Sequence, residues 1–246
     1  ALLAMLIAVE AGFQAALMAP TEILARQHYN TLKPLLDRAG VRSLCLTGRD
    51  KGKTRESLLQ EIAGGDAQIV VGTHAVFQET VEFKDLAMAV IDEQHRFGVH
   101  QRLSLAAKGQ SAVDVLVMTA TPIPRTLTLT AYGDMEVSRL TEKPPRRAPI
   151  DTRALPLSRL DETVAAVERA IGAGAQVYWV CPLVEESEDS DLAAADARHA
   201  ALERVLGNRV GLIHGRMKGP EKDEVMGRFA RGDLNVLVAT TVIEVG

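Results

Sequence analysis

Short apolar runs alternate with stretches of helical sequence along this chain, and this alternation restricts the possible folds more than any other feature. In the first part of the chain, the apolar runs lie at residues 14–19, 41–46, 69–71, 86–91 and 113–118. Helical sequence at 21–40 and 53–63 separates some of these runs. Strands that alternate with helices are typical of βαβ units, which build a parallel sheet covered by helices. The sequence therefore predicts an α/β fold with a parallel, doubly wound sheet.

A proline-rich segment at residues 141–149 interrupts this alternation. It contains Pro144, Pro145 and Pro149, and proline cannot continue a helix or a central strand. We predict two α/β domains in tandem, residues 1–143 and 150–246, joined by a linker at 144–149. In the second domain we expect helices at 161–171, 192–206 and 219–231 and strands at 177–181, 210–213 and 236–239.

Two adjacent acids, Asp92 and Glu93, follow the apolar run at 86–91. A buried parallel strand would deliver them to the carboxyl edge of its sheet, where ligands of open α/β sheets bind. A carboxylate at this edge can hold Mg²⁺, directly or through water, beside the phosphates of a nucleotide. The next carboxylate can orient or deprotonate an attacking water. We therefore predict Asp92 as the metal-side acid and Glu93 as the catalytic base, although the pair alone also fits a strand that ends in solvated acids.

The composition is that of a soluble globular protein, with 47% hydrophobic and 24% charged residues. The formal net charge is −4, so nucleic-acid binding would depend on local basic stretches and backbone amides, not on a global field. No apolar run reaches the roughly 18 residues of a membrane span. Cys45 and Cys181 lie far apart in apolar runs, which favours buried free thiols in a reducing cytosol over a disulfide.

The segment Gly48–Thr54 contains a Gly-Lys-Thr sequence and is the internal candidate for a phosphate-binding loop. A Walker A loop needs four residues between its first glycine and the Gly-Lys pair, and this segment has three. We interpret the segment as a basic loop and helix start, with Lys51 and Lys53 suited to contact a DNA backbone. A solvated surface helix is an equally good interpretation of the same residues.

The string Asp92-Glu93-Gln94-His95 resembles the DExH box, the Walker B motif of superfamily 2 helicases. The residues that follow, 96–102, narrow the resemblance to two families: RecG, the branch-migration helicases, and the transcription-repair coupling translocases. Gln94 favours RecG, because the coupling translocases usually have a second glutamate there. The segments 144–152 and 181–183 also favour RecG.

Other stretches resemble further helicase motifs in the order in which the family has them. Residues 18–28 resemble motif Ia, 71–75 motif Ib, 119–126 motif III, 178–187 the motif IV region and 238–246 motif V. Taken alone, the motif Ia stretch indicates no more than a helix capped by Thr21. Trp179, in the motif IV region, is more typical of a core residue than of a platform for stacking bases. The shared order is far more specific, because it covers nearly the whole chain.

The resemblance assigns roles to particular residues. Gln94 and His95 would join Asp92 and Glu93 in the catalytic site. Motif III would couple the phosphate state of the nucleotide to domain closure through Thr119, Ala120, Thr121 and Arg125. Together with the basic loop, the residues expected to contact nucleic acid are Pro20, Thr21, Arg26, Lys51, Lys53, Gly72, Thr73, His74, Thr240 and Thr241.

The resemblance implies two RecA-like domains that use ATP and Mg²⁺ to move on branched double-stranded DNA, such as forks and Holliday junctions, in recombination and repair. It also implies a monomer in the bacterial cytoplasm. Two alternatives stay open: a piece of a transcription-repair coupling translocase, or a non-catalytic DNA-binding module on a helicase fold. The intact pair of Asp92 and Glu93 argues against the second alternative for the whole protein.

The family's Walker A loop would lie just before Ala1 and its motif VI just after Gly246, so we expect a piece of a longer motor. The 246-residue chain alone should neither bind ATP tightly nor hydrolyse it, because a Walker A loop supplies the lysine and amides that cradle the phosphates. Titration with a fluorescent ATP analogue and Mg²⁺, and a phosphate-release assay with forked DNA, test this. Micromolar binding that Lys53→Ala removes would show that Gly48–Thr54 is a phosphate loop after all.

Overall fold

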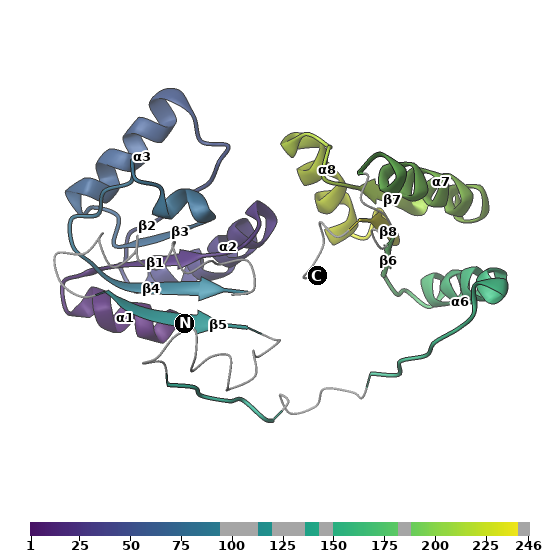
Figure 1. Ribbon diagram of the computed structural model, residues 1–246, viewed down its shortest axis with the longest axis horizontal. Coiled ribbons are helices and arrows are strands. Elements are labelled where there is room, and N and C mark those ends of the chain that lie inside the picture. The colour runs from purple at the N-terminus through teal and green to yellow at the C-terminus, as the bar shows by residue number, and fades with distance from the viewer. Residues whose placement is uncertain (94–112, 120–135, 143–149, 182–187, 241–246) are drawn as a thin grey trace. The chain divides into compact units, whose positions relative to one another are not determined.

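The structure, a computed structural model, describes residues 1–93, 113–119, 136–142, 150–181 and 188–240 (Figure 1). The chain divides into two compact units, Ala1–Arg139 and Leu140–Gly246. Each unit is built around one parallel β-sheet with helices packed against it, which confirms the predicted α/β fold. The predicted linker at 144–149 lies outside the described residues, so its bounds stay a prediction.

The first unit contains a sheet of five parallel strands in the order β2-β3-β1-β4-β5. The strands are β1 (Gln14–Met18), β2 (Ser43–Leu46), β3 (Ile69–Gly72), β4 (Leu86–Asp92) and β5 (Asp114–Met118). Strand β1 lies in the middle, and Met18 at its end pairs with Gly72 on one side and Ile91 on the other. The ends of β1, β3 and β4 therefore meet at one edge of the sheet.

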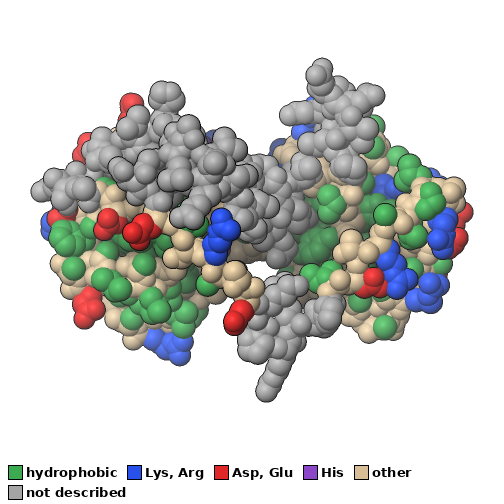
Figure 2. Space-filling model, turned by 60° about the horizontal axis from the view of Figure 1, so that its bottom comes forward, with side chains coloured by type: hydrophobic (Ala, Val, Ile, Leu, Met, Phe, Trp, Pro, Cys, Tyr) green, Lys and Arg blue, Asp and Glu red, His purple; other side chains and the backbone are tan. Residues whose placement is uncertain are grey.

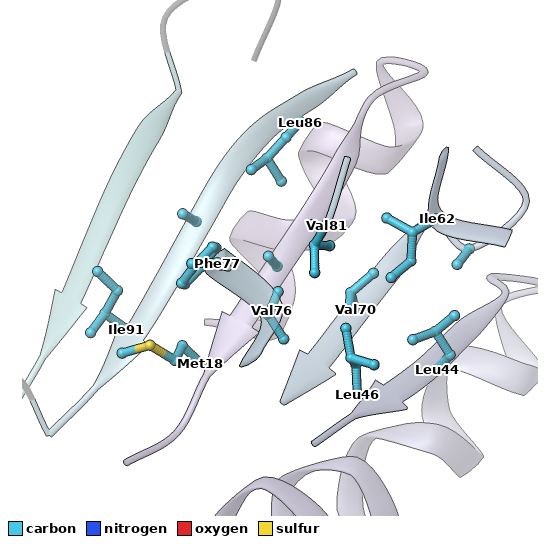
Figure 3. Close-up of a cluster of buried hydrophobic side chains, with 13 residues drawn as sticks. Met18, Leu44, Leu46, Ile62, Val70, Val76, Phe77, Val81, Leu86 and Ile91 are labelled. Atoms are coloured by element: carbon cyan, nitrogen blue, oxygen red, sulfur yellow. The ribbon is translucent and has the colours of Figure 1, made fainter. Parts of the chain in front are cut away.

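Helices cover both faces of this sheet. Among the described residues these helices are α1 (Leu2–Glu10), α2 (Glu22–Arg38), α3 (Gly52–Gly64) and the 3-10 helix η1 (His74–Phe77), which the sequence did not predict. The core on one face contains residues of α1 and α2, and the core on the other face, drawn in Figure 3, contains residues of α3 and η1. All five residues of β1 are buried between these two layers. Burial on both faces explains why β1 and its neighbours read as continuous apolar runs rather than alternating ones.

Gln14 is a polar side chain inside this core, only 4% exposed, at the start of β1. Its amide nitrogen donates to the carbonyl oxygens of Ile62 (2.9 Å) and Ala67 (2.7 Å), and its amide oxygen accepts from the backbone of Asp85 (3.0 Å). The side chain thus hydrogen-bonds to three backbone groups, which belong to the end of α3 and to the segments leading into β3 and β4.

The second unit contains a sheet of three parallel strands in the order β6-β8-β7. Its strands are β6 (Val177–Val180), β7 (Val210–Ile213) and β8 (Val236–Ala239), and its helices are α6 (Leu160–Gly172), α7 (Glu188–Leu206) and α8 (Gly219–Ala230), with 3-10 turns at Leu157–Arg159 and Gly207–Arg209. Residues of α6 and α7 form the core with β6, β7 and β8. Helix α7 begins at Glu188, earlier than the predicted residue 192, because it includes acidic residues that carry no helix-start signal.

Trp179 of β6 packs against this second core, as expected, and the guanidinium of Arg198 lies 5.4 Å from the centre of its ring. Both cysteines are free thiols, but Cys45 is only partly buried, so the prediction of full burial holds for Cys181 alone. Burial raises the pKa of Cys45 to about 11 and also raises the pKa of Cys181. Both therefore stay protonated at neutral pH and are poor nucleophiles. Within the described part of the chain, we find no helix of the length and apolarity needed to cross a bilayer.

Replacing Gln14 by Leu should destabilise the first domain, because the carbonyl of Ala67 and the backbone N–H of Asp85 lose this partner, at a cost of about 1–3 kcal/mol for each group left unsatisfied. The carbonyl of Ile62 keeps its hydrogen bond from the backbone of Gly65. Urea unfolding followed by circular dichroism measures the effect. Gln27→Leu, at an exposed position of α2, is the matched control and should change the free energy of unfolding by less than about 0.5 kcal/mol. Equal stability of the two variants would contradict the proposed role of Gln14.

Candidate functional site

The carboxyl edge of the first sheet gathers polar residues from all five strands. Thr47 follows β2, Thr73 follows β3, and Asp92 is the last residue of β4. Asp92 pairs with Met118 of β5, so Thr119 lies one residue beyond this edge. The loop after β1 leads through Thr21 into α2. The structure therefore brings predicted residues from four separate motifs to one edge, as the parallel strands require.

The carboxylate of Asp92 is held at both oxygens. Its Oδ2 lies 2.7 Å from Nε2 of His28, a residue of α2, and its Oδ1 accepts a hydrogen bond of 3.0 Å from the backbone of Glu93. The Asp92 side chain is 19% exposed and that of His28 is 32% exposed, so water only partly competes for this contact. The distance to His28 is typical of a hydrogen bond to an ionised acceptor.

Glu93 has a backbone φ of +50°, and among the described residues it is the one non-glycine with a positive φ. The left-handed conformation is unfavourable for a residue with a side chain, and such residues are common at functional sites. The chain bends at Glu93, directly after β4, and the backbone N–H of Glu93 donates to Oδ1 of Asp92.

The donor set at this edge fits Mg²⁺. Magnesium in nucleotide sites takes one or two carboxylates, and waters and phosphate oxygens complete its shell. The described residues include no group of three or more metal-ligating side chains. A nucleotide-bound Mg²⁺ does not require such a group, because waters and phosphates supply its other ligands. Each oxygen of Asp92 already accepts one hydrogen bond and has a second lone pair available. Asp92 could therefore hold the ion directly or through water, as predicted, beside Glu93 as the expected base.

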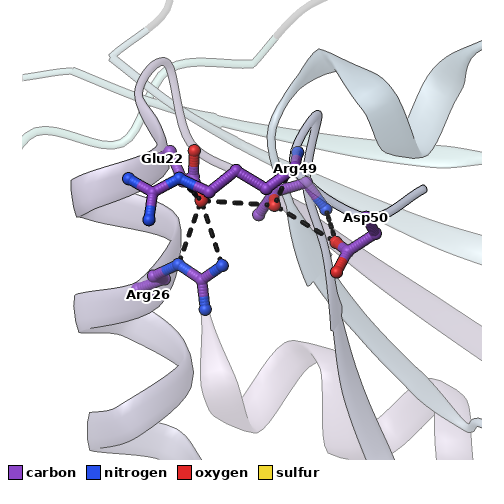
Figure 4. A network of polar contacts seen from close by, with 5 residues as sticks. Glu22, Arg26, Arg49 and Asp50 are labelled. Atoms are coloured by element: carbon purple, nitrogen blue, oxygen red, sulfur yellow. Dashed lines mark hydrogen bonds and ion pairs between the residues drawn. The ribbon is translucent and has the colours of Figure 1, made fainter. Parts of the chain in front are cut away.

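Thr21 caps α2, as the sequence predicted, because its hydroxyl accepts from the backbone of Leu24 at 3.3 Å. The neighbouring residue Glu22 is the centre of a polar network (Figure 4). Its Oε1 lies 3.0 Å from the guanidinium of Arg26 and 2.9 Å from that of Arg49. Arg26, predicted to contact nucleic acid, thus also makes an internal ion pair, while its side chain stays 43% exposed.

The same network includes hydrogen bonds within the loop between β2 and α3. Thr47 is fully buried, and its hydroxyl lies 3.4 Å from Oε1 of Glu22. Oδ2 of Asp50 accepts from the backbone (2.7 Å) and the hydroxyl (3.1 Å) of Thr47. The predicted contact residues Lys51 and Lys53 follow directly and are exposed. The network therefore ties the first turn of α2 to the loop that leads into Lys51 and into α3, where Lys53 lies.

Two of the three predicted residues of motif Ib have clear roles in the fold. A Cβ atom on Gly72 would lie 2.0 Å from the carbonyl oxygen of Leu46 and 2.5 Å from a methyl group of Val76, so no side chain fits. Thr73 is buried and its hydroxyl accepts from the backbone of Ala75 at 3.4 Å, which caps η1. His74 is exposed.

In the second domain, Thr240 directly follows β8 and is buried, and its backbone donates to Ile213 at 3.4 Å. His214 follows β7, and its Nδ1 is buried without a hydrogen-bond partner among the described residues. Six predicted residues lie outside the described part of the chain: Gln94, His95, Ala120, Thr121, Arg125 and Thr241.

Sequence reasoning missed His28, Glu22 and Arg49 as parts of this site. His28 and Glu22 lie inside the stretch that resembles motif Ia, but nothing in their spacing shows that one meets Asp92 and the other Arg49. These contacts join residues far apart in the sequence, and only the packing of α2 across the sheet edge brings them together.

Comparison with known proteins supports the resemblance. The pattern of the DEAD/DEAH box helicase family matches residues 1–130, and that of the helicase conserved C-terminal domain matches residues 161–246. The chain belongs to the DEAD/DEAH box helicase family. Its two units are the two RecA-like domains of such a helicase, arranged in tandem.

Within this family the chain resembles RecG over its whole length. It is 51% identical to the ATP-dependent DNA helicase RecG of Escherichia coli O157:H7 and 46% identical to that of Bacillus subtilis, covering 36% of each. A solved structure of RecG bound to a three-way DNA junction matches 99% of this chain, with a TM-score of 0.72, 38% identity and 31% of that chain covered. The chain thus spans about a third of the length of these relatives.

The fit at Gly72 predicts that Gly72→Ala destabilises the first domain by about 1–3 kcal/mol, since the added methyl group must displace backbone atoms of β2. Gly48→Ala is the matched control, because nothing lies within 4 Å of the added Cβ and its φ is not positive. Thermal unfolding of both variants measures the difference. If Gly72→Ala has the same melting temperature as the wild type, the described close approach of β2 and β3 is wrong.

Proposed function

We propose that this chain is the central part of the motor of an ATP-dependent DNA helicase that acts on branched DNA. The observation that carries the proposal is the edge of the first sheet, where Asp92 is fixed by His28 and stands beside Glu93 and Thr119. Two acids at the end of a buried strand, next to a hydroxyl from the neighbouring strand, suit the hydrolysis of a nucleotide.

In this proposal, Asp92 holds Mg²⁺, directly or through water, and Glu93 orients and deprotonates the attacking water. Bound Mg²⁺ would neutralise charge on the β- and γ-phosphates of ATP. Gln94 and His95 complete the DExH box. The described structure supports the first two roles, because the Asp92 carboxylate is already oriented and Glu93 follows it directly with a left-handed backbone conformation.

Motif III would couple hydrolysis to movement through Thr119, Ala120, Thr121 and Arg125. The position of Thr119 supports this role, because the register of β4 and β5 sets it one residue beyond the partner of Asp92. A hydroxyl at this position can hydrogen-bond to the acids or to the γ-phosphate. Binding or release of the γ-phosphate would then change the hydrogen bonds of motif III.

DNA contacts would come from several small groups of residues. In the view of Figure 2, Lys and Arg side chains are scattered among hydrophobic and neutral ones, as expected for a chain with a net charge of −4. Phosphates would meet the amides at the start of α2 and the loops after β3 and β8. The proposed contact residues are Pro20, Thr21, Arg26, Lys51, Lys53, Gly72, Thr73, His74, Thr240 and Thr241.

The proposed substrate is branched double-stranded DNA, including forks and Holliday junctions, and the proposed setting is recombination and repair in the bacterial cytoplasm by a monomer. The similarity to a RecG bound to a three-way DNA junction supports this choice. A transcription-repair coupling translocase is the second candidate, and the RecG-like glutamine at position 94 counts against it. A non-catalytic DNA-binding module would have no need of both Asp92 and Glu93.

In the full-length protein, Glu93→Gln should lower ATP turnover on forked DNA by about 10²–10⁴-fold, because the amide cannot accept the proton of the attacking water. Binding of a fluorescent ATP analogue should stay within about threefold of wild type, as the change is nearly isosteric. Phosphate release, fork unwinding and analogue binding are measured together. Gln27→Ala, at an exposed position of α2, serves as the control. Wild-type turnover in the Glu93→Gln variant would exclude Glu93 as the base.

A further inference from the structure

The contact between His28 and Asp92 is not explained by the proposed roles of the motifs. His28 belongs to α2, and its side chain crosses to the end of β4 to reach the carboxylate at 2.7 Å. The residue lies well inside α2, beyond Thr21, Glu22 and Arg26, whose contacts are with α2 itself and with the loop after β2. His28 therefore takes no part in the cap at Thr21 or in the network around Glu22.

We propose that His28 is a positioning residue for Asp92, holding the carboxylate in the orientation that binds Mg²⁺. This inference rests on the proposed nucleotide hydrolysis. An aspartate side chain at the end of a strand can rotate about two bonds, so its oxygens have no fixed position without partners. His28 fixes Oδ2 from one side, and the backbone of Glu93 fixes Oδ1 from the other.

The chemistry of the pair supports this role. A carboxylate only accepts hydrogen bonds, so Nε2 of His28 must carry the proton that it shares with Oδ2. The hydrogen bond increases the order of the carboxylate without consuming all of its acceptor sites, because each oxygen still has a lone pair for the ion or its water. Partners of this kind behind a metal ligand commonly change metal affinity or activity by about 10–100-fold.

The opposite role would be competition, in which His28 occupies the oxygen that the ion needs. The two roles predict opposite effects of removing the imidazole. If His28 positions Asp92, its removal weakens Mg²⁺ binding. If His28 competes with the ion, its removal tightens Mg²⁺ binding. Both side chains are partly exposed, 32% for His28 and 19% for Asp92, so solvent reaches the pair.

The test is an equilibrium measurement on the full-length protein, in which Mg²⁺ is titrated at a fixed concentration of a fluorescent ATP analogue. His28→Ala should raise the Mg²⁺ concentration for half-saturation about tenfold. His28→Gln can place an amide N–H near the position of Nε2 and should return to within about threefold of wild type. Gln27→Ala, on the exposed side of the same helix, should match the wild type. Thermal melts without nucleotide check that all four proteins are folded.

The outcomes separate this inference from the proposed function. If the wild type binds the analogue with Mg²⁺ but His28→Ala binds it equally well or more tightly, His28 does not position Asp92 and the hydrolysis proposal stands. If His28→Gln is as weak as His28→Ala and both melt early, the residue supports the fold only, and the inference is again overturned. If the wild type shows no Mg²⁺-dependent binding, the proposed function itself fails, and this inference fails with it.

Discussion

The parallel hydrogen-bond ladder on both sides of β1 is the constraint on which the rest of the first domain depends. It pairs Met18 with Gly72 and with Ile91, so three strands end at the same level. Every loop that follows these strands is then forced to the same edge, whatever its sequence. The ladder is stable because both faces of β1 are covered, which makes its position in the middle of the sheet the favourable one.

The residues at the two ends of this sheet have different structural roles. At the amino end, the side chain of Gln14 hydrogen-bonds to backbone groups of three segments that enter the core. At the carboxyl end, Gly72 lets β2 and β3 approach until no Cβ fits, and Thr73 starts η1 directly afterwards. These two residues of a supposed DNA-binding motif therefore have sufficient structural reasons to be what they are, and any contact with DNA would come in addition.

The strands, the cap at Thr21 and the placement of the acids could be predicted from sequence, because each depends on local pattern: apolar runs, a hydroxyl before a helix, and acids after a strand. The start of α7 and the turn η1 were missed, because an acidic stretch and a buried four-residue turn have weak local signals. The contacts of His28 and of Glu22 could not be predicted at all, since they depend on how α2 packs on the sheet.

Helix α2 contacts both the loop after β2 and the end of β4. Glu22 in its first turn binds Arg49 of the loop after β2, and His28 further along binds Asp92 at the end of β4. Leu36 near its far end is fully buried in the core, which fixes the helix against the sheet. Glu22 and His28 lie within two turns of the same helix, so the position of its first turn and the orientation of Asp92 depend on one element.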